Sequence, residues 1–314
     1  VWDVETGPAG TDLKTKSFVL RTAEGCVIPA QKIKDGHYWG HSFVDLVFPV
    51  QVEALGYNTC VIEEGTVQGF DAPVRCTEKP ARQVSFTPEL PTLENEFIEV
   101  EFDSLTGGIR TLIDKKSGRN LADPANPLGV LEYVLERPWG MSSWVIAPAQ
   151  ECDYPLKVHS LVLTQKGPFH AAVEAKLKVK DSDVTITYSL KAGQPSLEIG
   201  IQAHWVEIGT KEKGAPCLRM RFPLALTQAR GLYEVPFGSI ERDLNHGEEV
   251  PSLRWVDVTG KPANARPASK GAAAGLALAN DSKDGYSLDG SLLRATLIRS
   301  SYEPDLIPEV GNHT

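Results

Sequence analysis

The chain has 314 residues, of which 41% are hydrophobic and 23% charged, the balance of a folded globular protein rather than a disordered one. Its formal net charge is −9 and it has no basic cluster interleaved with aromatic residues, which argues against nucleic acid as a partner, while no apolar run is long enough to span a membrane. The five cysteines are odd in number and form no C-x-x-C pair, which favours a reducing, cytoplasmic setting over a disulfide or zinc framework.

Alternation of apolar and polar side chains predicts β-strands along most of the chain. The clearest segments with this period of two are SFVLRTA, HSFVDLVFPVQV, FIEVEF, AAVEAKLKVK, VTITYSL, SLEIGIQAHW and LRMRFPLAL. No amphipathic helix of three turns is recognisable, and glycine and proline recur at the spacing typical of a β-sandwich. The sequence therefore predicts an all-β protein.

The distribution of prolines divides this all-β chain in two. Residues 1–65 hold four or five strand candidates and are expected to form a small β-sandwich. Residues 66–92 contain four prolines in sequence of mixed polarity and are predicted to be a linker. Residues 93–314 are predicted to form a large antiparallel β-sandwich, with a mobile loop at residues 260–275. The first and last residues are expected to mark an excised piece, truncated at its C-terminus.

Two histidines four residues apart occur in the segment HYWGH, at His37 and His41. On a helix this spacing would place both on one metal ion, but the glycines predict a turn, the glutamate of a zincin motif is missing and no third ligand is apparent. We therefore expect no metal site here, and interpret the segment as surface aromatics at a domain edge.

The most regular stretch, LENEFIEVEFDSLTGGIRTLIDKKSGRNL, occupies residues 93–121. It lacks both phosphate-loop glycine patterns, so its Thr-Gly-Gly predicts a turn between two strands, followed by a second turn at Ser117 and Gly118. One face should be buried and the other exposed. We expect Ile98, Val100 and Phe102 to point inward and Glu99, Glu101 and Arg110 outward.

Residues 234–258 gather six acidic residues and His246 around turn-forming residues. A pair of these carboxylates could serve as the acid and base of a glycosidase or the base of an epimerase, and the alternative is that they are solvated loop charges. The Ser of FGSIE lacks the glycine frame of a nucleophile elbow, so a serine hydrolase is not indicated.

A strand candidate ending near Arg299 leads into the polar, aromatic-bearing segment SSYEPD. Loops that leave the edge of a sandwich often hold sugars. Arg299 could donate a fork of hydrogen bonds to hydroxyls or carboxylates, and Tyr302 could stack on a sugar ring. The alternative is that Arg299 only pairs with Glu303 or Asp305.

Four stretches, taken in chain order, resemble one enzyme family. They are LENEFIEVEFDSLTGGIRTLIDKKSGRNL, LERPWGMSSWVIAP, YEVPFGSIERDLNHGEEVPSLRWVDV and GLALANDSKDGYSLDGSLLRATLIRSSYEPD. The family is glycoside hydrolase family 38, the α-mannosidases, and the resemblance is to its C-terminal β-domains over residues 93–313 and more loosely over residues 1–65. It implies a small β-sandwich followed by a large antiparallel β-supersandwich similar to galactose mutarotases.

The resemblance also implies what this chain lacks. The family uses a retaining mechanism with an Asp nucleophile, a carboxylic acid/base and zinc, or another divalent metal, in N-terminal domains whose motifs are absent here. This chain would then carry no catalytic residue and bind no metal, and would hydrolyse terminal α-mannosides only within the full polypeptide. Its partners would be its own catalytic and helical domains and the carbohydrate, with a homo-oligomer left open. Arg299, Tyr302 and Asp305 would lie near the substrate.

Two other functions stay open at this point. The sandwich could be a mutarotase-type sugar epimerase, with His170 or His204 acting together with Glu241, or a carbohydrate-binding or structural module. The chain also departs from the family pattern, because it stops just after the segment VGNHT where the family continues into further strands. An exposed sheet edge or an incomplete sandwich is therefore expected.

Overall fold

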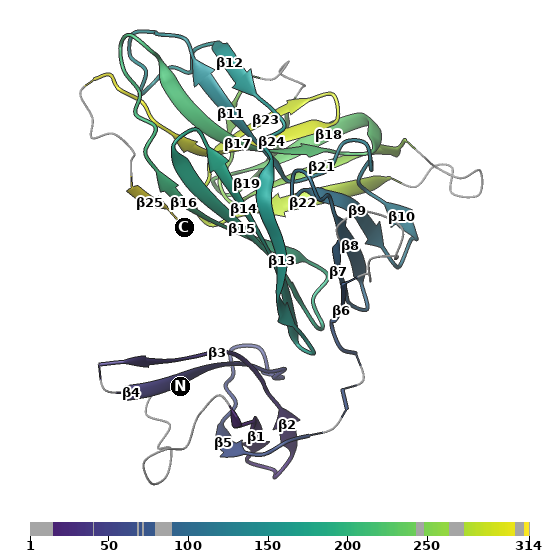
Figure 1. Ribbon diagram of the computed structural model, residues 1–314. Coiled ribbons are helices and arrows are strands. Elements are labelled where there is room, and N and C mark those ends of the chain that lie inside the picture. Colours follow the sequence, from purple (N-terminus) through teal and green to yellow (C-terminus); the bar gives the residue numbers. More distant parts are fainter. Residues whose placement is uncertain are drawn as a thin grey trace, which may run out of the picture.

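The structure is a computed structural model that describes residues 15–39, 41–67, 69–70, 72–78, 90–242, 248–263, 273–304 and 311–313. Its named elements are all β-strands (Figure 1), and their sheets are antiparallel, which confirms the predicted all-β fold. Within the described ranges no helix exists that would be long and apolar enough to cross a membrane.

Two small sheets occupy one end of the molecule, at the bottom of Figure 1. A central strand, β1 (Phe18–Thr22), pairs on one side with β2 (Val27–Pro29) and on the other with β5 (Cys60–Glu64). The strands β3 (Gln31–Tyr38) and β4 (His41–Val47) form a separate hairpin. The core between them is small and contains Phe18 and Val44 with Leu46 packed against them.

The buried side chain of Gln31 joins this small unit to the rest of the chain. Its Oε1 accepts hydrogen bonds from the backbone N–H groups of Phe169 (2.8 Å) and His170 (2.9 Å), and its Nε2 donates to the His170 carbonyl (2.8 Å). Gln165 returns a bond from its Nε2 to the carbonyl of Ile33 at 2.8 Å. The contact is therefore made largely by backbone groups of a turn between two long strands.

The next sheet has the order β10-β9-β8-β7-β6. Its strands are β6 (Arg75–Glu78), β7 (Pro91–Glu94), β8 (Ile98–Phe102), β9 (Ile109–Asp114) and β10 (Arg119–Asn120). The strand β6 lies inside the predicted linker at residues 66–92 and pairs with β7 along its whole length. That part of the segment belongs to the sheet, while residues 79–89 lie outside the described ranges. The proposed domain limits stay a prediction.

Three further sheets build the main sandwich. The six-stranded sheet, β12-β11-β17-β24-β23-β20, consists of β11 (Val130–Glu136), β12 (Ala149–Asp153), β17 (Ala215–Pro223), β20 (Val250–Pro251), β23 (Gly285–Asp289) and β24 (Leu292–Arg299). The five-stranded sheet, β13-β14-β15-β16-β25, consists of β13 (Val158–Lys166), β14 (His170–Val179), β15 (Ser182–Lys191), β16 (Leu197–Trp205) and β25 (Gly311–His313). The four-stranded sheet, β19-β18-β21-β22, consists of β18 (Leu226–Val235), β19 (Gly238–Arg242), β21 (Trp255–Pro262) and β22 (Ala274–Ala279).

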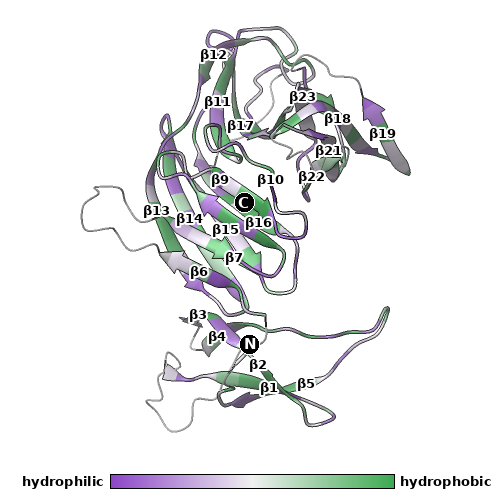
Figure 2. Cartoon of the chain, turned by 90° about the vertical axis from the view of Figure 1, so that its right-hand side faces the viewer, coloured by the Kyte–Doolittle hydropathy of each residue, from purple (hydrophilic) through white to green (hydrophobic). Residues whose placement is uncertain are grey.

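One hydrophobic cluster runs through all of the larger sheets. Along β15 buried residues alternate with more exposed ones, as a strand with one face on the core requires, and Figure 2 shows hydrophobic and hydrophilic residues mixed along β13 to β16 in the same way. The largest side chains that are wholly buried are Trp205, Tyr188, Tyr233, Tyr286 and Phe102.

The hairpin at residues 93–121 forms as predicted. Val100 and Phe102 are fully buried and Arg110 is exposed, whereas Ile98 and the two glutamates are half-buried. The Thr-Gly-Gly turn needs glycine for space as well as for conformation. A Cβ at Gly107, which has φ +68°, would lie 2.9 Å from Val158, and a Cβ at Gly108 would lie 2.5 Å from Val130.

Asp103 fixes the start of this turn. Its Oδ1 accepts hydrogen bonds from the N–H groups of Leu105 (3.1 Å) and Thr106 (2.8 Å) and from the Thr106 hydroxyl (2.7 Å). We expect Asp103→Ala to lower the free energy of unfolding by about 1–2 kcal/mol, the usual cost of losing such a cap. Urea denaturation would measure it, and an exposed Asp123→Ala variant, whose carboxylate accepts one turn bond from Ala125, should lose less. Equal losses would contradict the assigned role.

The strand β16 is only partly covered at its outer edge. There β25 pairs with Ala203, His204 and Trp205, and within the described ranges no strand pairs with the edge from Leu197 to Gln202. The loop predicted at residues 260–275 is shorter in the structure, because residues 260–262 belong to β21 and residues 274–275 to β22, and residues 264–272 lie outside the described ranges.

Candidate functional site

Two loops at the same end of the sandwich expose a set of apolar side chains. The β11–β12 connection, residues 137–148, exposes Trp144 at 69% and Trp139 at 46%, and the loop at residues 206–214 exposes Ile208. An exposed apolar patch of this kind usually marks a surface that another protein or domain contacts. We call this set the apolar rim; it consists of Trp139, Met141, Trp144, Val145, Ile146, Val206 and Ile208.

Below the rim, a buried ion pair joins the ends of two strands. Glu136 ends β11 and Arg299 ends β24, and both strands pair with the intervening β17. Arg299 Nε lies 2.7 Å from Glu136 Oε1 and Nη2 lies 2.8 Å from Oε2, the bidentate geometry in which an arginine–carboxylate pair is strongest. The Glu136 side chain is 1% exposed, so this carboxylate depends on Arg299 for its charge balance.

The same guanidinium group also holds the loop that carries the tryptophans. Arg299 donates from Nη1 to the carbonyl of Ser142 (2.6 Å) and from Nη2 to that of Val145 (3.0 Å), while Glu136 Oε2 accepts from the N–H of Ala147 (2.9 Å). Burial alone would lower the pKa of Arg299, but the hydrogen bond and charge of Glu136 outweigh it, so that this pKa is raised. We call this arrangement the arginine clamp.

Tyr302 fixes the other side of the loop. Its hydroxyl accepts a hydrogen bond from the Trp139 N–H (2.7 Å) and donates to the Trp139 carbonyl (2.9 Å). The hydroxyl of Ser142 accepts from the N–H groups of Tyr302 (3.0 Å) and Glu303 (2.9 Å), and the N–H of Ser143 donates to the Glu303 carbonyl (2.8 Å). The exposed tryptophans therefore stand on a loop whose backbone is held at many points.

Two glycines in the loop at residues 206–214 let its backbone approach the arginine clamp closely. A Cβ at Gly214, where φ is +102°, would lie 1.8 Å from the carbonyl oxygen of Glu136, and one at Gly209 would lie 2.1 Å from that of Ser300. No side chain fits in either place. The two loops consequently form one surface rather than two separate projections.

The structure brings Arg299 and Tyr302 together beneath the rim. The partner of Arg299 is Glu136, which the sequence did not identify, and the carboxylate of Glu303 instead lies 3.7 Å from Lys211. Asp305 lies outside the described residues. That Arg299, Tyr302 and Asp305 lie near a substrate stays a prediction. The alternation VLEYVLE was the available signal for Glu136, because it places this residue and Glu132 on one face of β11.

Three of the acidic residues at 234–258 have separate local partners. Glu241 is exposed and its carboxylate lies 3.6 Å from Arg230, whereas Glu249 is half-buried and lies 3.6 Å from Arg219. The carboxylate of Glu234 accepts a bond from the Arg254 backbone. His246 lies outside the described ranges.

The three residues considered for epimerase chemistry lie on three different strands. His170 begins β14, His204 is on β16 and Glu241 is on β19. Burial lowers the pKa of His170, and its Nδ1 has no hydrogen-bond partner among the described residues. The Nδ1 of His204 lies 3.0 Å from the Asn312 side chain, and Glu241 faces Arg230. Among the described residues, no hydrogen bond or ion pair joins either histidine to Glu241.

Metal ligands do not converge in the part of the chain that the structure describes, where no three His, Cys, Asp or Glu side chains could hold an ion together. The segment HYWGH forms the turn of the β3–β4 hairpin. Its His37 Nδ1 lies 3.5 Å from the Ser42 hydroxyl, and the side chain of His41 is not described. The absence of a metal site at this segment stays a prediction.

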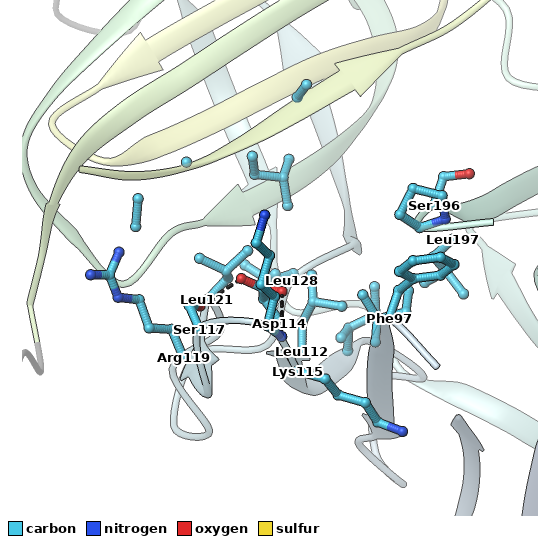
Figure 3. A pocket seen from close by; sticks show the side chains of 18 of the residues that line it. Phe97, Leu112, Asp114, Lys115, Ser117, Arg119, Leu121, Leu128, Ser196 and Leu197 are labelled. Carbon is cyan, nitrogen blue, oxygen red and sulfur yellow. Dashed lines mark hydrogen bonds between the residues drawn. The ribbon is translucent and has the colours of Figure 1, made fainter. Parts of the chain in front are cut away.

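One hollow is a groove of about 910 Å³ lined by residues of β8, β9, β10, β16 and β22 (Figure 3). A second hollow of about 630 Å³ shares Leu197, Ile199 and Phe222 with it. Among the polar groups that line the first groove, Asp114 accepts hydrogen bonds from the Ser117 hydroxyl and the Lys116 N–H. Lys115 and Arg119 are also engaged locally, with Glu94 and with the Ala273 carbonyl, so the lining combines apolar side chains with polar ones that already have partners.

The fold and the sequence have recognisable relatives. The family model described as "Glycosyl hydrolases family 38 C-terminal domain" matches residues 93–306. Alpha-mannosidase 2C1 of Homo sapiens is 27% identical over 255 residues, which are 75% of this chain and 22% of that protein. Alpha-mannosidase of Saccharomyces cerevisiae is 24% identical, over 78% of this chain and 24% of its own length.

A solved structure supports the fold independently. The alpha-mannosidase from Enterococcus faecalis V583 superimposes with a TM-score of 0.64 over 95% of this chain and 37% of its own, at 13% sequence identity. At that identity the likeness concerns the fold alone. The chain spans only about a quarter of the length of the curated relatives above.

Proposed function

The chain belongs to the C-terminal domain family of the family 38 glycosyl hydrolases, and from this membership we propose that it is the non-catalytic β-domain portion of a retaining, metal-dependent α-mannosidase that hydrolyses terminal α-mannosides. The family match over residues 93–306 carries the proposal, and the names of the relatives support the substrate class. In this proposal the catalytic carboxylates and the zinc, or other divalent metal, belong to the part of the relatives' length that this chain does not span.

In this proposal the apolar rim is the surface that meets the catalytic part of the enzyme. Two tryptophans and neighbouring aliphatic side chains supply the apolar area, and large apolar side chains are the usual anchors of such contacts. The arginine clamp keeps their loop in one conformation before contact, so that little conformational entropy is lost on docking. Arg299, Tyr302 and Asp305 would thereby lie at the edge of the sugar site.

The first test compares the chain with the complete polypeptide. With zinc added, the isolated 314-residue chain should release no aryl group from an aryl α-mannoside, while the complete polypeptide should. The reason is that a double displacement needs two carboxylates about 5–5.5 Å apart, and these are assigned to the other domain. Metal-dependent turnover by the isolated chain would overturn the non-catalytic assignment.

A second test removes the two tryptophans of the rim. Trp139→Ser with Trp144→Ser should leave the melting temperature of the isolated chain within about 2 °C, because both side chains are exposed there. In the complete polypeptide the same pair should lower activity by tenfold or more, as expected when interface anchors worth about 2 kcal/mol are lost.

The matched control for this pair is Phe237→Ser, which removes another fully exposed aromatic side chain at the β18–β19 turn. It should leave both the isolated chain and the complete enzyme unchanged. Activity that is equally insensitive to the tryptophan pair would show that the rim faces solvent in the whole enzyme.

A further inference from the structure

Three arginines gather on one face of the six-stranded sheet, away from the clamp. In the segment RMRF, alternation sends Met220 and Phe222 into the core and turns Arg219 and Arg221 to the opposite face. Across the ladder Arg221 lies opposite Arg294 of β24, and Arg219 lies opposite Glu132 of β11. Strand pairing alone therefore places three guanidinium groups side by side.

Two carboxylates face these arginines. Glu132, with its side chain 3% exposed, accepts a hydrogen bond from Arg221 Nη1 at 2.8 Å and lies 3.4 Å from Arg294 Nε. Glu249 lies 3.6 Å from Arg219 Nη2 and already accepts a hydrogen bond from the Thr296 hydroxyl. Three positive charges therefore face two carboxylates, of which Glu132 is buried and Glu249 half-buried.

The arginines also lack acceptors. Among the described residues, their side chains make a single hydrogen bond to an oxygen, that of Arg221, and the buried Nε atoms of Arg219 and Arg221 have no partner. Unpaired buried donors of this kind are uncommon and costly. Burial and the charges of Arg221 and Arg219 lower the pKa of Arg294, against the pull of Glu132 and of the more distant, exposed Asp289.

The arginine clamp shows how a purely structural arginine on this same face is arranged. There one arginine meets one carboxylate, and four hydrogen bonds reach carboxylate or carbonyl oxygens. In the three-arginine cluster the charge does not balance, and the Nε donors of Arg219 and Arg221 stay unused. The side chains of Arg219, Arg221 and Arg294 nevertheless remain 15%, 16% and 19% exposed, so a solute can reach the cluster.

Tyr154 borders the cluster and limits how the arginines can move. The Arg221 guanidinium carbon lies 3.9 Å from the centroid of the Tyr154 ring, and the tyrosine hydroxyl donates to Asn126 at 3.4 Å. Stacking of this kind pre-orients a guanidinium fork for a planar or tetrahedral acceptor. The Arg221 guanidinium group is thus positioned by the Tyr154 ring as well as by the strand that carries it.

We propose that Arg219, Arg221 and Arg294 form a binding site for one oxyanion, a carboxylate or a phosphate-class group, on this face of the six-stranded sheet. Such a ligand supplies the missing negative charge and the missing acceptors together. The proposal is independent of the α-mannosidase assignment, because it rests on the charges and contacts of this cluster alone.

Titration of the 314-residue chain with sodium phosphate, sulfate or acetate, at ionic strength held constant with chloride, tests the site. A saturable rise in melting temperature is expected, with a midpoint on the order of millimolar, together with shifts of the arginine Nε–H NMR signals of Arg219 and Arg221. Saturation by acetate alone assigns a carboxylate, and saturation by phosphate or sulfate assigns a tetrahedral anion. No saturable response to any of the three overturns the proposal.

Variants tie the response to the cluster. Arg294→Gln should weaken binding at least about tenfold, the effect of losing one charged hydrogen-bond donor. If that variant does not fold, Arg294→Lys keeps the charge, removes the fork and should still weaken binding several-fold. The control is Arg230→Gln, an exposed arginine of β18 that faces Glu241, and it should bind as the unaltered chain does. Equal weakening by the control would mean that only general screening was measured.

Discussion

Replacing Arg299 by methionine is expected to lower the free energy of unfolding by about 3–5 kcal/mol, because it leaves the buried carboxylate of Glu136 without its partner. The loop at residues 137–148 loses two carbonyl anchors in the same step. Urea denaturation followed by tryptophan fluorescence would measure the loss, and emission of the two rim tryptophans should report a loosened loop even below the unfolding transition.

Two further variants separate the charge effect from lost packing. The single variant Arg299→Met leaves the Glu136 carboxylate buried without a counter-charge. Adding Glu136→Gln removes that charge, so the free energy of unfolding should recover by about 1–3 kcal/mol relative to Arg299→Met alone. Arg110→Met replaces an exposed arginine of β9 and should change stability by less than about 0.5 kcal/mol. A loss below about 1 kcal/mol for Arg299→Met would contradict the clamp.

Alanine at Gly214 is expected to destabilise the chain by about 3 kcal/mol or more. Its Cβ would lie 1.8 Å from the carbonyl oxygen of Glu136, and φ at this residue is +102°, a conformation costly for any side chain. Backbone atoms cannot rotate away as a flexible side chain can, so the end of β11 must shift and the clamp with it. Thermal and urea denaturation would give the loss.

Gly118→Ala is the matched control for Gly214→Ala. Gly118 also has a positive φ, +66°, but a Cβ there meets nothing within 4 Å. The control should therefore show only the conformational part of the cost, about 1 kcal/mol. If the two variants lose the same stability, the close approach of the two loops is not what requires glycine at position 214.

The sequence predicted the elements whose causes are local. The hairpin at residues 93–121 formed as expected, because alternation sets its faces and Asp103 and the glycines set its turn. The short strand β6 was missed because four residues among prolines carry too little periodicity to stand out, and its pairing with β7 is what makes it a strand.

The clamp could not be predicted in the same way. Glu136 and Arg299 are 163 residues apart, and they meet because β17 lies between their strands in the sheet. Periodicity tells which face of a strand a side chain occupies, but not which strand lies two places away. The three-arginine cluster depends on the same strand order, so its residues attracted no attention in the sequence.

The incompletely paired edge of β16 bears on how this chain behaves in solution. Between Leu197 and Gln202 the strand pairs with β15 on one side, while its outer edge has no strand partner in the described part of the chain, and the apolar groove lies beside this edge. An unpaired strand edge next to an apolar groove is a template to which a strand of another molecule can add. The isolated chain should therefore self-associate as its concentration is raised. A charged substitution on that edge, such as Ile199→Lys, should reduce this self-association.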